Sequence, residues 1–198
     1  GAWALLAALG ACAPTQTDGT TGPESVRSFQ STRVAHPRGE AEAVTVNLTL
    51  SFWDTTITAL DDADQLIEAA FDYLGEIVFD VTGTVEKEVF IAQDNKNQVY
   101  EGEEAGRWQI ALSPDVTTRL AIEASLGALD ADLSALDLEA LDLDMSTGDA
   151  TIRLPDRASG IALAFSGSLG DLDLTVPDGT PLSTDDPVKL STGTTTLH

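Results

Sequence analysis

The sequence predicts an all-β protein, built as a single-stranded β-solenoid-like stack of rungs of about 22 residues each. A turn containing serine recurs along the second half of the chain. Ser125, Ser146, Ser168 and Ser191 follow one another at intervals of 21, 22 and 23 residues, and apolar and polar residues alternate around these turns. A single repeat of this kind cannot bury its own apolar face, so we expect the rungs to stack on one shared core.

The alternation places the apolar residues of a strand on one face and its polar residues on the other. Around the turn of Ser146, the apolar positions are 141, 143 and 145 before it and 150, 152 and 154 after it. Stacking predicts two interior columns, with Leu129, Ala150 and Leu172 in one and Ala131, Ile152 and Leu174 in the other. A charged residue in either column should break the stack.

Glycine occupies the third position of each turn, at Gly127, Gly148, Gly170 and Gly193. It suits a left-handed backbone conformation, which costs other residues about 1 kcal/mol or more. Serine or aspartate beside the glycine can hydrogen bond locally to the amides of the turn. We therefore expect these glycines to be structural.

The β domain is expected to span residues 43–198, and its first part, 43–115, is less regular than its second. Strands are predicted at 44–50, 76–81, 86–93 and 107–112, with Ser51 as the first turn serine. Residues 66–74 have a helix-like composition, but the repeat spacing favours a strand because Gly75 lies 22 residues beyond Trp53. We expect the middle region to break the repeat. Regular rungs should then occupy 116–198, with the last rung incomplete at His198.

Residues 1–12 are small and apolar and end at Cys12, the one cysteine of the chain. This run is too short to span a bilayer and has the character of the hydrophobic region of a signal peptide. Leu9-Gly10-Ala11-Cys12 resembles the lipobox of prokaryotic lipoproteins, which implies acylation of Cys12 and a location in the cell envelope. The alternative is a buried thiol at an apolar terminus. Residues 13–42 lack a hydrophobic period and are predicted to form a flexible tether, including Arg33 and His36.

The formal net charge is −23, from 33 acidic and 10 basic residues. Such an excess of acids argues against binding nucleic acid, which needs clustered lysine and arginine, and against direct binding to anionic lipid. Acids on outward positions keep a long β surface soluble and oppose association between sheet edges. A high-salt habitat and divalent-cation binding are compatible with the same residues.

The motifs of common catalytic and cofactor sites are missing from the sequence. Its histidines are His36 and His198, and there is neither a nucleophile elbow nor a cluster of zinc ligands. Gly167-Ser168-Leu169-Gly170 is a repeat turn without a phosphate-binding lysine after it. We therefore predict that the protein is not an enzyme and uses no cofactor.

Paired carboxylates are the one abundant reactive group. Each pair occupies the same outward face of a strand, at Asp130 and Asp132, Asp142 and Asp144, and Asp171 and Asp173. Two carboxylates at a suitable separation suffice for glycoside hydrolysis, but no aromatic sugar platform accompanies them. Calcium, which binds clustered oxygen ligands, is the better candidate for these six residues.

The order of the predicted strands and turns is similar to that of the toast-rack domains of bacterial envelope proteins, including LiaF-like, PspC-related and adhesin-like proteins. The residues that carry the resemblance are 108–112, 120–128 and 141–155, with Leu169-Gly170-Asp171 in the closing rung. The resemblance implies a β-solenoid-like stack in which the repeated motif is structural and holds no catalytic residues.

These expectations together favour a lipid-anchored envelope protein whose β domain is a non-enzymatic, adhesin-like interaction or assembly module. Its partner would be an envelope protein or a cell-wall component, and the same surfaces allow a homo-oligomer. The alternative is a module that binds glycans or cations at the cell surface. A third interpretation, an envelope-stress regulator, rests on the resemblance to LiaF-like proteins alone.

Overall fold

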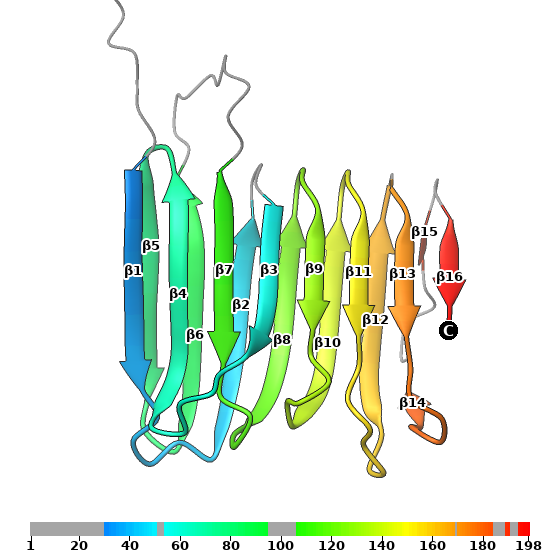
Figure 1. Ribbon diagram of the computed structural model, residues 1–198, viewed down its shortest axis with the longest axis horizontal. Coiled ribbons are helices and arrows are strands. Elements are labelled where there is room, and N and C mark those ends of the chain that lie inside the picture. The colour runs from blue at the N-terminus through cyan, green and yellow to red at the C-terminus, as the bar shows by residue number, and fades with distance from the viewer. Residues whose placement is uncertain (1–29, 51–53, 95–105, 169, 184–188, 191–193) are drawn as a thin grey trace, which may run out of the picture.

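The computed structural model describes residues 30–50, 54–94, 106–168, 170–183, 189–190 and 194–198. The described residues form two facing eight-stranded sheets whose strands run across the long axis of the molecule (Figure 1). No helix among them is long and apolar enough to cross a bilayer. The predicted all-β, β-solenoid-like stack is confirmed.

In spatial order, sheet A contains β1 (Gln30–Pro37), β4 (Gln65–Tyr73), β7 (Arg107–Leu112), β3 (Asp54–Ala59), β9 (Leu129–Asp132), β11 (Ala150–Arg153), β13 (Leu172–Thr175) and β16 (Thr195–Leu197). Sheet B contains β14 (Leu182–Ser183), β12 (Ile161–Gly167), β10 (Leu138–Met145), β8 (Thr117–Ala124), β2 (Ala43–Leu50), β6 (Glu86–Asp94) and β5 (Glu76–Gly83), and β15 (Lys189–Leu190) also pairs with β12. Inward side chains of both sheets form one hydrophobic core.

Each regular rung contributes one strand to sheet B and the next strand to sheet A. The pairs β8 and β9, β10 and β11, and β12 and β13 stack in parallel in both sheets. Ala150 pairs with Leu129 and Leu172, while Ile152 pairs with Ala131 and Leu174. All six side chains of the predicted columns are at most 5% exposed, so the interior positions are confirmed.

The turn glycines are required for two separate reasons. Gly127, Gly148 and Gly170 have φ angles of 115°, 127° and 118°, in the region that favours glycine. In addition, a Cβ on Gly148 would lie 1.9 Å from the carbonyl oxygen of Gly127, and one on Gly170 would lie 1.5 Å from that of Gly148. The turns therefore stack too closely to admit a side chain. Gly193 lies outside the described residues.

The aspartates of these turns bond to the next rung, rather than within their own turn as predicted. The Asp171 amide donates to Asp149 Oδ1 at 3.0 Å, and the Thr194 amide donates to Asp171 Oδ1 at 2.9 Å. Where the first regular rung meets β3, the Ala128 amide donates to Asp54 Oδ1 at 3.1 Å. Ala128 occupies the corresponding position of its own rung but has no carboxylate to continue this ladder.

The first half of the stack corrects one prediction. Residues 30–37 form β1 and so do not belong to a flexible tether; their polar side chains hid an alternation in which Val34 packs against the core. The middle region interrupts the spacing of about 22 residues, since Val89 and Leu120 both pair with Val46 but lie 31 residues apart. Its strands nevertheless belong to the stack, because β6 pairs in parallel with β2 and β7 with β3. The rung of β2 and β3 thus lies between that of β6 and β7 and that of β8 and β9 (Figure 1).

The strand preferred over a helix at 66–74 is confirmed as β4, but this rung runs in the reverse direction. The chain passes from sheet A to sheet B through a turn at Gly75, so β4 is antiparallel to β7 and β5 is antiparallel to β6. β1 then pairs antiparallel with β4 at the edge of sheet A. Trp108 and Phe71, the two largest side chains that are fully buried among the described residues, meet edge to face in this half, with 4.8 Å between ring centroids.

Candidate functional site on the outer face of sheet A

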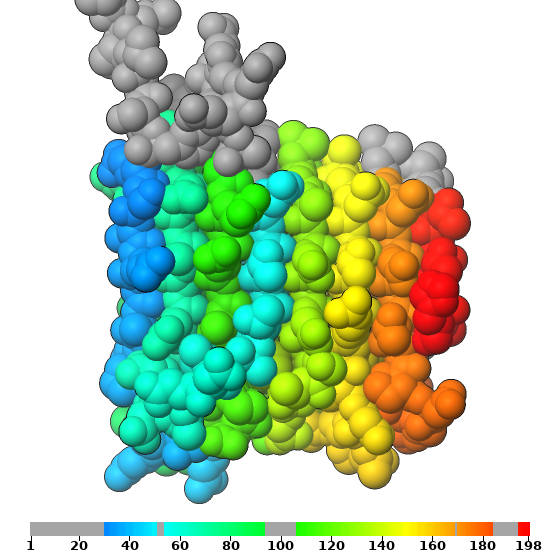
Figure 2. Space-filling model, viewed as in Figure 1, coloured from blue at the N-terminus to red at the C-terminus, as the bar shows by residue number. Residues whose placement is uncertain are grey.

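The outer face of sheet A is a nearly flat surface, on which outward side chains form rows that cross the strands (Figure 2). One row contains Arg33, Ala70, Gln109 and Thr56, on β1, β4, β7 and β3. The next row contains Ala35, Glu68, Ala111 and Thr58 on the same strands. Alanines therefore alternate with longer polar side chains across β1, β4 and β7.

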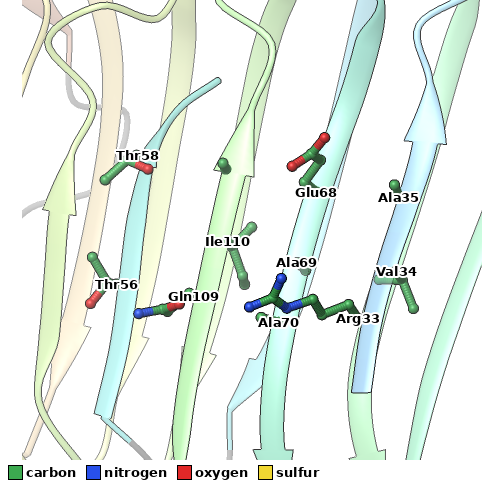
Figure 3. A pocket seen from close by; sticks show the side chains of 11 residues that line it. Arg33, Val34, Ala35, Thr56, Thr58, Glu68, Ala69, Ala70, Gln109 and Ile110 are labelled. Atoms are coloured by element: carbon green, nitrogen blue, oxygen red, sulfur yellow. The ribbon is translucent and has the colours of Figure 1, made fainter. Parts of the chain in front are cut away.

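Because the alanines are short, the surface is hollowed over β1, β4 and β7. One depression of about 600 Å³ includes Arg33, Ala70 and Gln109 in its lining (Figure 3). A second, of about 490 Å³, shares these three residues and extends to Asp72 and Arg107. We call the combined depression the arginine hollow; its outward lining residues are Ser31, Arg33, Ala35, Thr56, Thr58, Glu68, Ala70, Asp72, Arg107, Gln109 and Ala111.

The arginines of the hollow differ from the others that the structure describes. Four form ion pairs, Arg38 with Asp115, Arg119 with Glu139, Arg153 with Asp132 and Arg157 with Asp137. Within the described residues, neither Arg33 nor Arg107 has an ion-pair partner. Arg33 extends over Ala70 toward Gln109, whereas Glu68 points away from it (Figure 3). Asp72, which pairs in register with Ser31, accepts a 2.5 Å hydrogen bond from the Ser31 hydroxyl.

Toward the C-terminus, the same face becomes acidic. The row of Arg33 continues through Asp130, Thr151 and Asp173. Asp130 and Asp173 are separated by the strand that carries Thr151, and the His198 ring contacts Asp173 Oδ1 at 3.5 Å. The arginine hollow, whose lining carries charges of both signs, and this acidic row thus share one face of the stack.

The six predicted calcium ligands are divided between two faces of the molecule. Asp130, Asp132 and Asp173 lie on strands of sheet A and Asp171 lies in the turn before β13, whereas Asp142 and Asp144 lie on β10 in sheet B. The structure therefore does not bring the three pairs together. Among the residues that it describes, no group of three or more histidine, cysteine, aspartate or glutamate side chains is placed to hold a metal ion.

Asp132 is instead bound to its neighbours. Its Oδ1 accepts hydrogen bonds from the Ser134 hydroxyl at 2.6 Å and the Ser134 amide at 3.2 Å, and its Oδ2 lies 3.7 Å from Arg153. The hydrogen bonds from Ser134, followed by the charge of Arg153, lower the pKa of this carboxyl because they stabilise its ionised form.

The two histidines lie at opposite edges of sheet A. His198 follows β16, whereas His36 belongs to β1, where its half-buried ring contacts Lys87 Nζ at 3.2 Å. Lys87 reaches across from sheet B and also donates to the Pro37 carbonyl at 3.1 Å. Burial, and then the positive charge of Lys87, lowers the pKa of His36.

Sequence analysis did not find the arginine hollow, because its residues come from separate parts of the chain. Arg33 was assigned to the tether, and Arg107 and Gln109 to a region outside the repeat. Only the antiparallel order of β1, β4 and β7 brings them to one surface. Cys12, predicted as the lipidation site, lies outside the described residues.

The fold is similar to those of solved bacterial proteins. A "putative cell adhesion protein" from Clostridium sporogenes matches with a TM-score of 0.72 and 16% sequence identity, over 86% of this chain and 99% of its own. A "putative adhesin" from Bacteroides fragilis matches with a TM-score of 0.35 and 11% identity, over 85% and 97% of the two chains. Another from Parabacteroides distasonis gives 0.28 and 11%, over 87% and 98%. At these identities, the first similarity shows a shared fold and the other two add no argument.

No curated protein matches the chain in sequence. A family model does match, over residues 22–175, and it describes the N-terminal domain of toast_rack, DUF2154. The matched region includes β1 and continues to the end of β13, so it contains both the reversed strands and the regular rungs. The predicted relationship is confirmed, and the chain belongs to the toast-rack N-terminal domain family.

Proposed function

We propose that this protein is a lipid-anchored component of the cell envelope whose β stack is a non-enzymatic, adhesin-like interaction module. The observation that carries the proposal is the outer face of sheet A, which is broad, nearly flat and open at the arginine hollow. Catalytic and cofactor sites are usually concave and enclose most of their ligand. An open, two-signed polar surface is better suited to contact with a large partner.

The family and the shared fold support this proposal. Toast-rack membership favours a location at the cell surface or in the envelope, and the structural relative from Clostridium sporogenes carries a name related to cell adhesion. The N-terminal sequence supports the anchor, because Leu9-Gly10-Ala11-Cys12 precedes a polar segment that leads to β1 at Gln30. Such a segment would hold the stack away from the membrane surface.

The anchor is tested by Cys12→Ser in the full reading frame, with Ala13→Ser as the matched control at the adjacent position. Metabolic labelling with an alkyne fatty acid and detergent phase partitioning would report acylation and membrane association. We expect Cys12→Ser to lose the label and enter the soluble fraction while Ala13→Ser keeps both properties. Membrane retention of Cys12→Ser without the label would refute the lipid anchor.

The interaction role is tested by placing a photo-crosslinking amino acid at exposed Thr151 on sheet A, with exposed Ala162 on sheet B as the control. Irradiation of cells that carry the anchored full-length protein should give adducts from Thr151 in excess of those from Ala162. Equal yields from both faces, or none from either, would contradict an interaction surface on sheet A.

A further inference from the structure

We propose that the outer face of sheet B carries a second docking surface, which binds a basic polypeptide segment that also presents apolar side chains. We call this surface the Phe90 patch; it consists of Val78 and Asp80 on β5 and of Glu88, Phe90 and Ala92 on β6. It lies on the sheet opposite to the arginine hollow, so the inference goes beyond the proposed function and does not depend on it.

The position of two exposed apolar side chains is the first argument. Val78 and Phe90 are 42% and 41% exposed, and both alternate with inward residues of the core, so they project outward from the sheet. The other exposed large apolar side chains of the described residues lie in turns or continue the inward columns at the C-terminal end of the stack; they are Val85, Leu126, Leu182 and Leu197. Within the described part of the chain, Val78 and Phe90 are thus the two that a sheet face presents to solvent.

Val78 and Phe90 lie close enough for one partner to contact both. On these antiparallel strands Val78 pairs in register with Ala92, and Asp80 pairs in register with Phe90. Val78 and Phe90 are therefore diagonal neighbours, at a separation of about 7–8 Å. The short side chain of Ala92 beside them leaves both accessible from the same side.

The charge of this face is the second argument. Two carboxylates, Asp80 and Glu88, belong to the patch, and β8 and β10 add Glu123, Asp142 and Asp144 to the same outer face. None of these five acids has an ion-pair partner among the residues that the structure describes. A patch of apolar side chains is thus surrounded by uncompensated negative charge.

The positive charge on this face is already neutralised. Arg119 is the one cation among the described outward side chains of β5, β6, β2, β8 and β10, and it lies 2.9 Å from Glu139. The lining of the arginine hollow differs, because its arginines and its acids are equal in number. The potential over this part of sheet B is therefore negative and favours a cationic partner.

An arginine side chain of the partner matches the groups at the centre of the patch. A guanidinium group can stack on an aromatic ring and also hydrogen bond to a carboxylate. Asp80 is in register with Phe90, so one guanidinium can reach both. The Asn47 amide, which is also in register with Phe90, donates to Glu88 Oε1 at 3.1 Å and holds this second carboxylate toward the same row.

Other ligands fit this surface less well. Nucleic acid and anionic lipid carry the same sign of charge as the patch and would be repelled. A small polyamine can pair with the carboxylates but has no side chain to cover Val78 and Phe90. A polypeptide segment supplies cations and apolar anchors together, which is the composition that the patch requires.

Binding is tested with the full-length chain and a fluorescent peptide of arginine and leucine, by fluorescence anisotropy. The comparison arms are the same peptide with every leucine replaced by glycine, the same peptide with every arginine replaced by glutamate, and spermine as a competitor. We expect the arginine–leucine peptide to bind, with an affinity that decreases as salt increases. The glycine peptide should bind about tenfold more weakly, the glutamate peptide should not bind, and spermine should compete poorly.

Variants locate the binding site. Phe90→Ala should reduce the affinity for the arginine–leucine peptide by about tenfold, because it removes the aromatic anchor. Its matched control is Leu126→Ala, which removes a side chain of similar exposure, 42%, from a turn. Asp80→Asn should reduce the affinity about threefold, as expected for an exposed charge. Its control is Asp178→Asn, which changes the net charge equally in the turn between β13 and β14. Circular dichroism melting would establish that the variants remain folded.

Four results would overturn the proposal: no binding of the arginine–leucine peptide, equal binding of the glycine peptide, unchanged binding in Phe90→Ala, or the same loss in Asp178→Asn as in Asp80→Asn. The last would mean that the peptide responds only to net charge. The outcome is distinguishable from that of the crosslinking experiment, because Thr151 lies on sheet A and Ala162 on β12 is separated from β6 by β2, β8 and β10. If the peptide does not bind and Thr151 still crosslinks preferentially, the Phe90 patch is not a docking surface and the proposed function stands.

Discussion

The two halves of the stack use similar rungs but connect them differently. From β8 to β13 the rungs follow chain order and every strand is parallel to its neighbours. Before β8, chain order is lost, because the rung of β2 and β3 lies between that of β6 and β7 and that of β8 and β9. The outer strands β1, β4 and β5 also run antiparallel to their neighbours. The repeat is thus a property of local spacing in one half and of long-range pairing in the other.

The reversed strands also change how the stack ends. At the N-terminal end the inward residues Val34, Ile77 and Phe79 are half-buried, whereas Leu197 at the opposite edge of sheet A is 65% exposed. The outer strands carry Arg33 and Pro37 on β1 and Asp80 on β5, the kinds of residue that discourage further strand addition. The antiparallel half therefore acts as a cap and also creates the arginine hollow.

The largest expected effect comes from a charge in the regular core. Ile152 is fully buried between Ala131 and Leu174, so Ile152→Asp would place an uncompensated carboxylate there and cost about 4 kcal/mol or more. Val34→Asp in the half-buried cap should cost clearly less. Urea unfolding followed by circular dichroism measures both, with Thr151→Asp on the exposed face as the control. Equal losses at Ile152 and Val34 would contradict the difference between the two halves.

The next effect concerns the stacked turns. Gly148→Ala combines a φ of 127° with a Cβ only 1.9 Å from the Gly127 carbonyl oxygen, so we expect a loss of about 3 kcal/mol. Gly179 has a φ of 87° but nothing within 4 Å of its Cβ position. Gly179→Ala should therefore cost only about 1 kcal/mol of unfolding free energy. Similar losses in the two variants would mean that backbone strain, rather than turn stacking, determines the need for glycine.

These contrasts show what could be predicted from the sequence. The columns through Ala150 and Ile152 were predictable because parallel rungs of nearly constant length place equivalent residues side by side. β1 was not, because Thr32, Val34 and His36 form a weak apolar pattern whose burial depends on pairing with β4. The position of β2 between β6 and β8 likewise depends on contacts between distant segments.

The features of the candidate site also differed in whether the sequence could predict them. Sequence analysis recognised that the aspartate pairs face outward, but their placement on two sheets depends on which strand enters which sheet. The arginine hollow required the chain reversal at β4, for which the sequence contains no local signal beyond Gly75. Surface chemistry in this stack is therefore predictable along a strand and much less so across strands.

A gain in stability is expected where the turn ladder is interrupted. The carboxylates of Asp149 and Asp171 each accept a hydrogen bond from a backbone amide of the following rung. Ala128 occupies the same turn position in its rung, but its side chain has no acceptor. Ala128→Asp should add one such bond, to the Asp149 amide, and raise the unfolding free energy by about 1 kcal/mol. Because the new carboxylate lies near Asp54 and Asp149, the gain should increase with salt. Ala128→Leu is the control without an acceptor, and an equal gain there would exclude the hydrogen bond as the cause.

The smallest expected effect is a pH dependence that belongs to the cap. Burial and the charge of Lys87 hold the pKa of His36 below its ordinary value of 6.5, so the unfolded chain takes up a proton before the folded protein does. Stability should therefore decrease as pH falls from about 6.5 toward the lowered pKa of the folded state. The corresponding loss at Asp132 begins only below 3.8, the ordinary value for that carboxyl, so the two windows are separate.

His36→Gln should remove the decrease in the upper window, as measured by urea unfolding at a series of pH values. Lys87→Met should reduce the decrease without abolishing it, because burial is the larger cause of the shift and remains in that variant. This pair distinguishes a charge contact between the two sheets from simple desolvation. If the slope of the unfolding free energy against pH is the same in His36→Gln as in the unmodified protein, then the titration of His36 is not the source of the decrease.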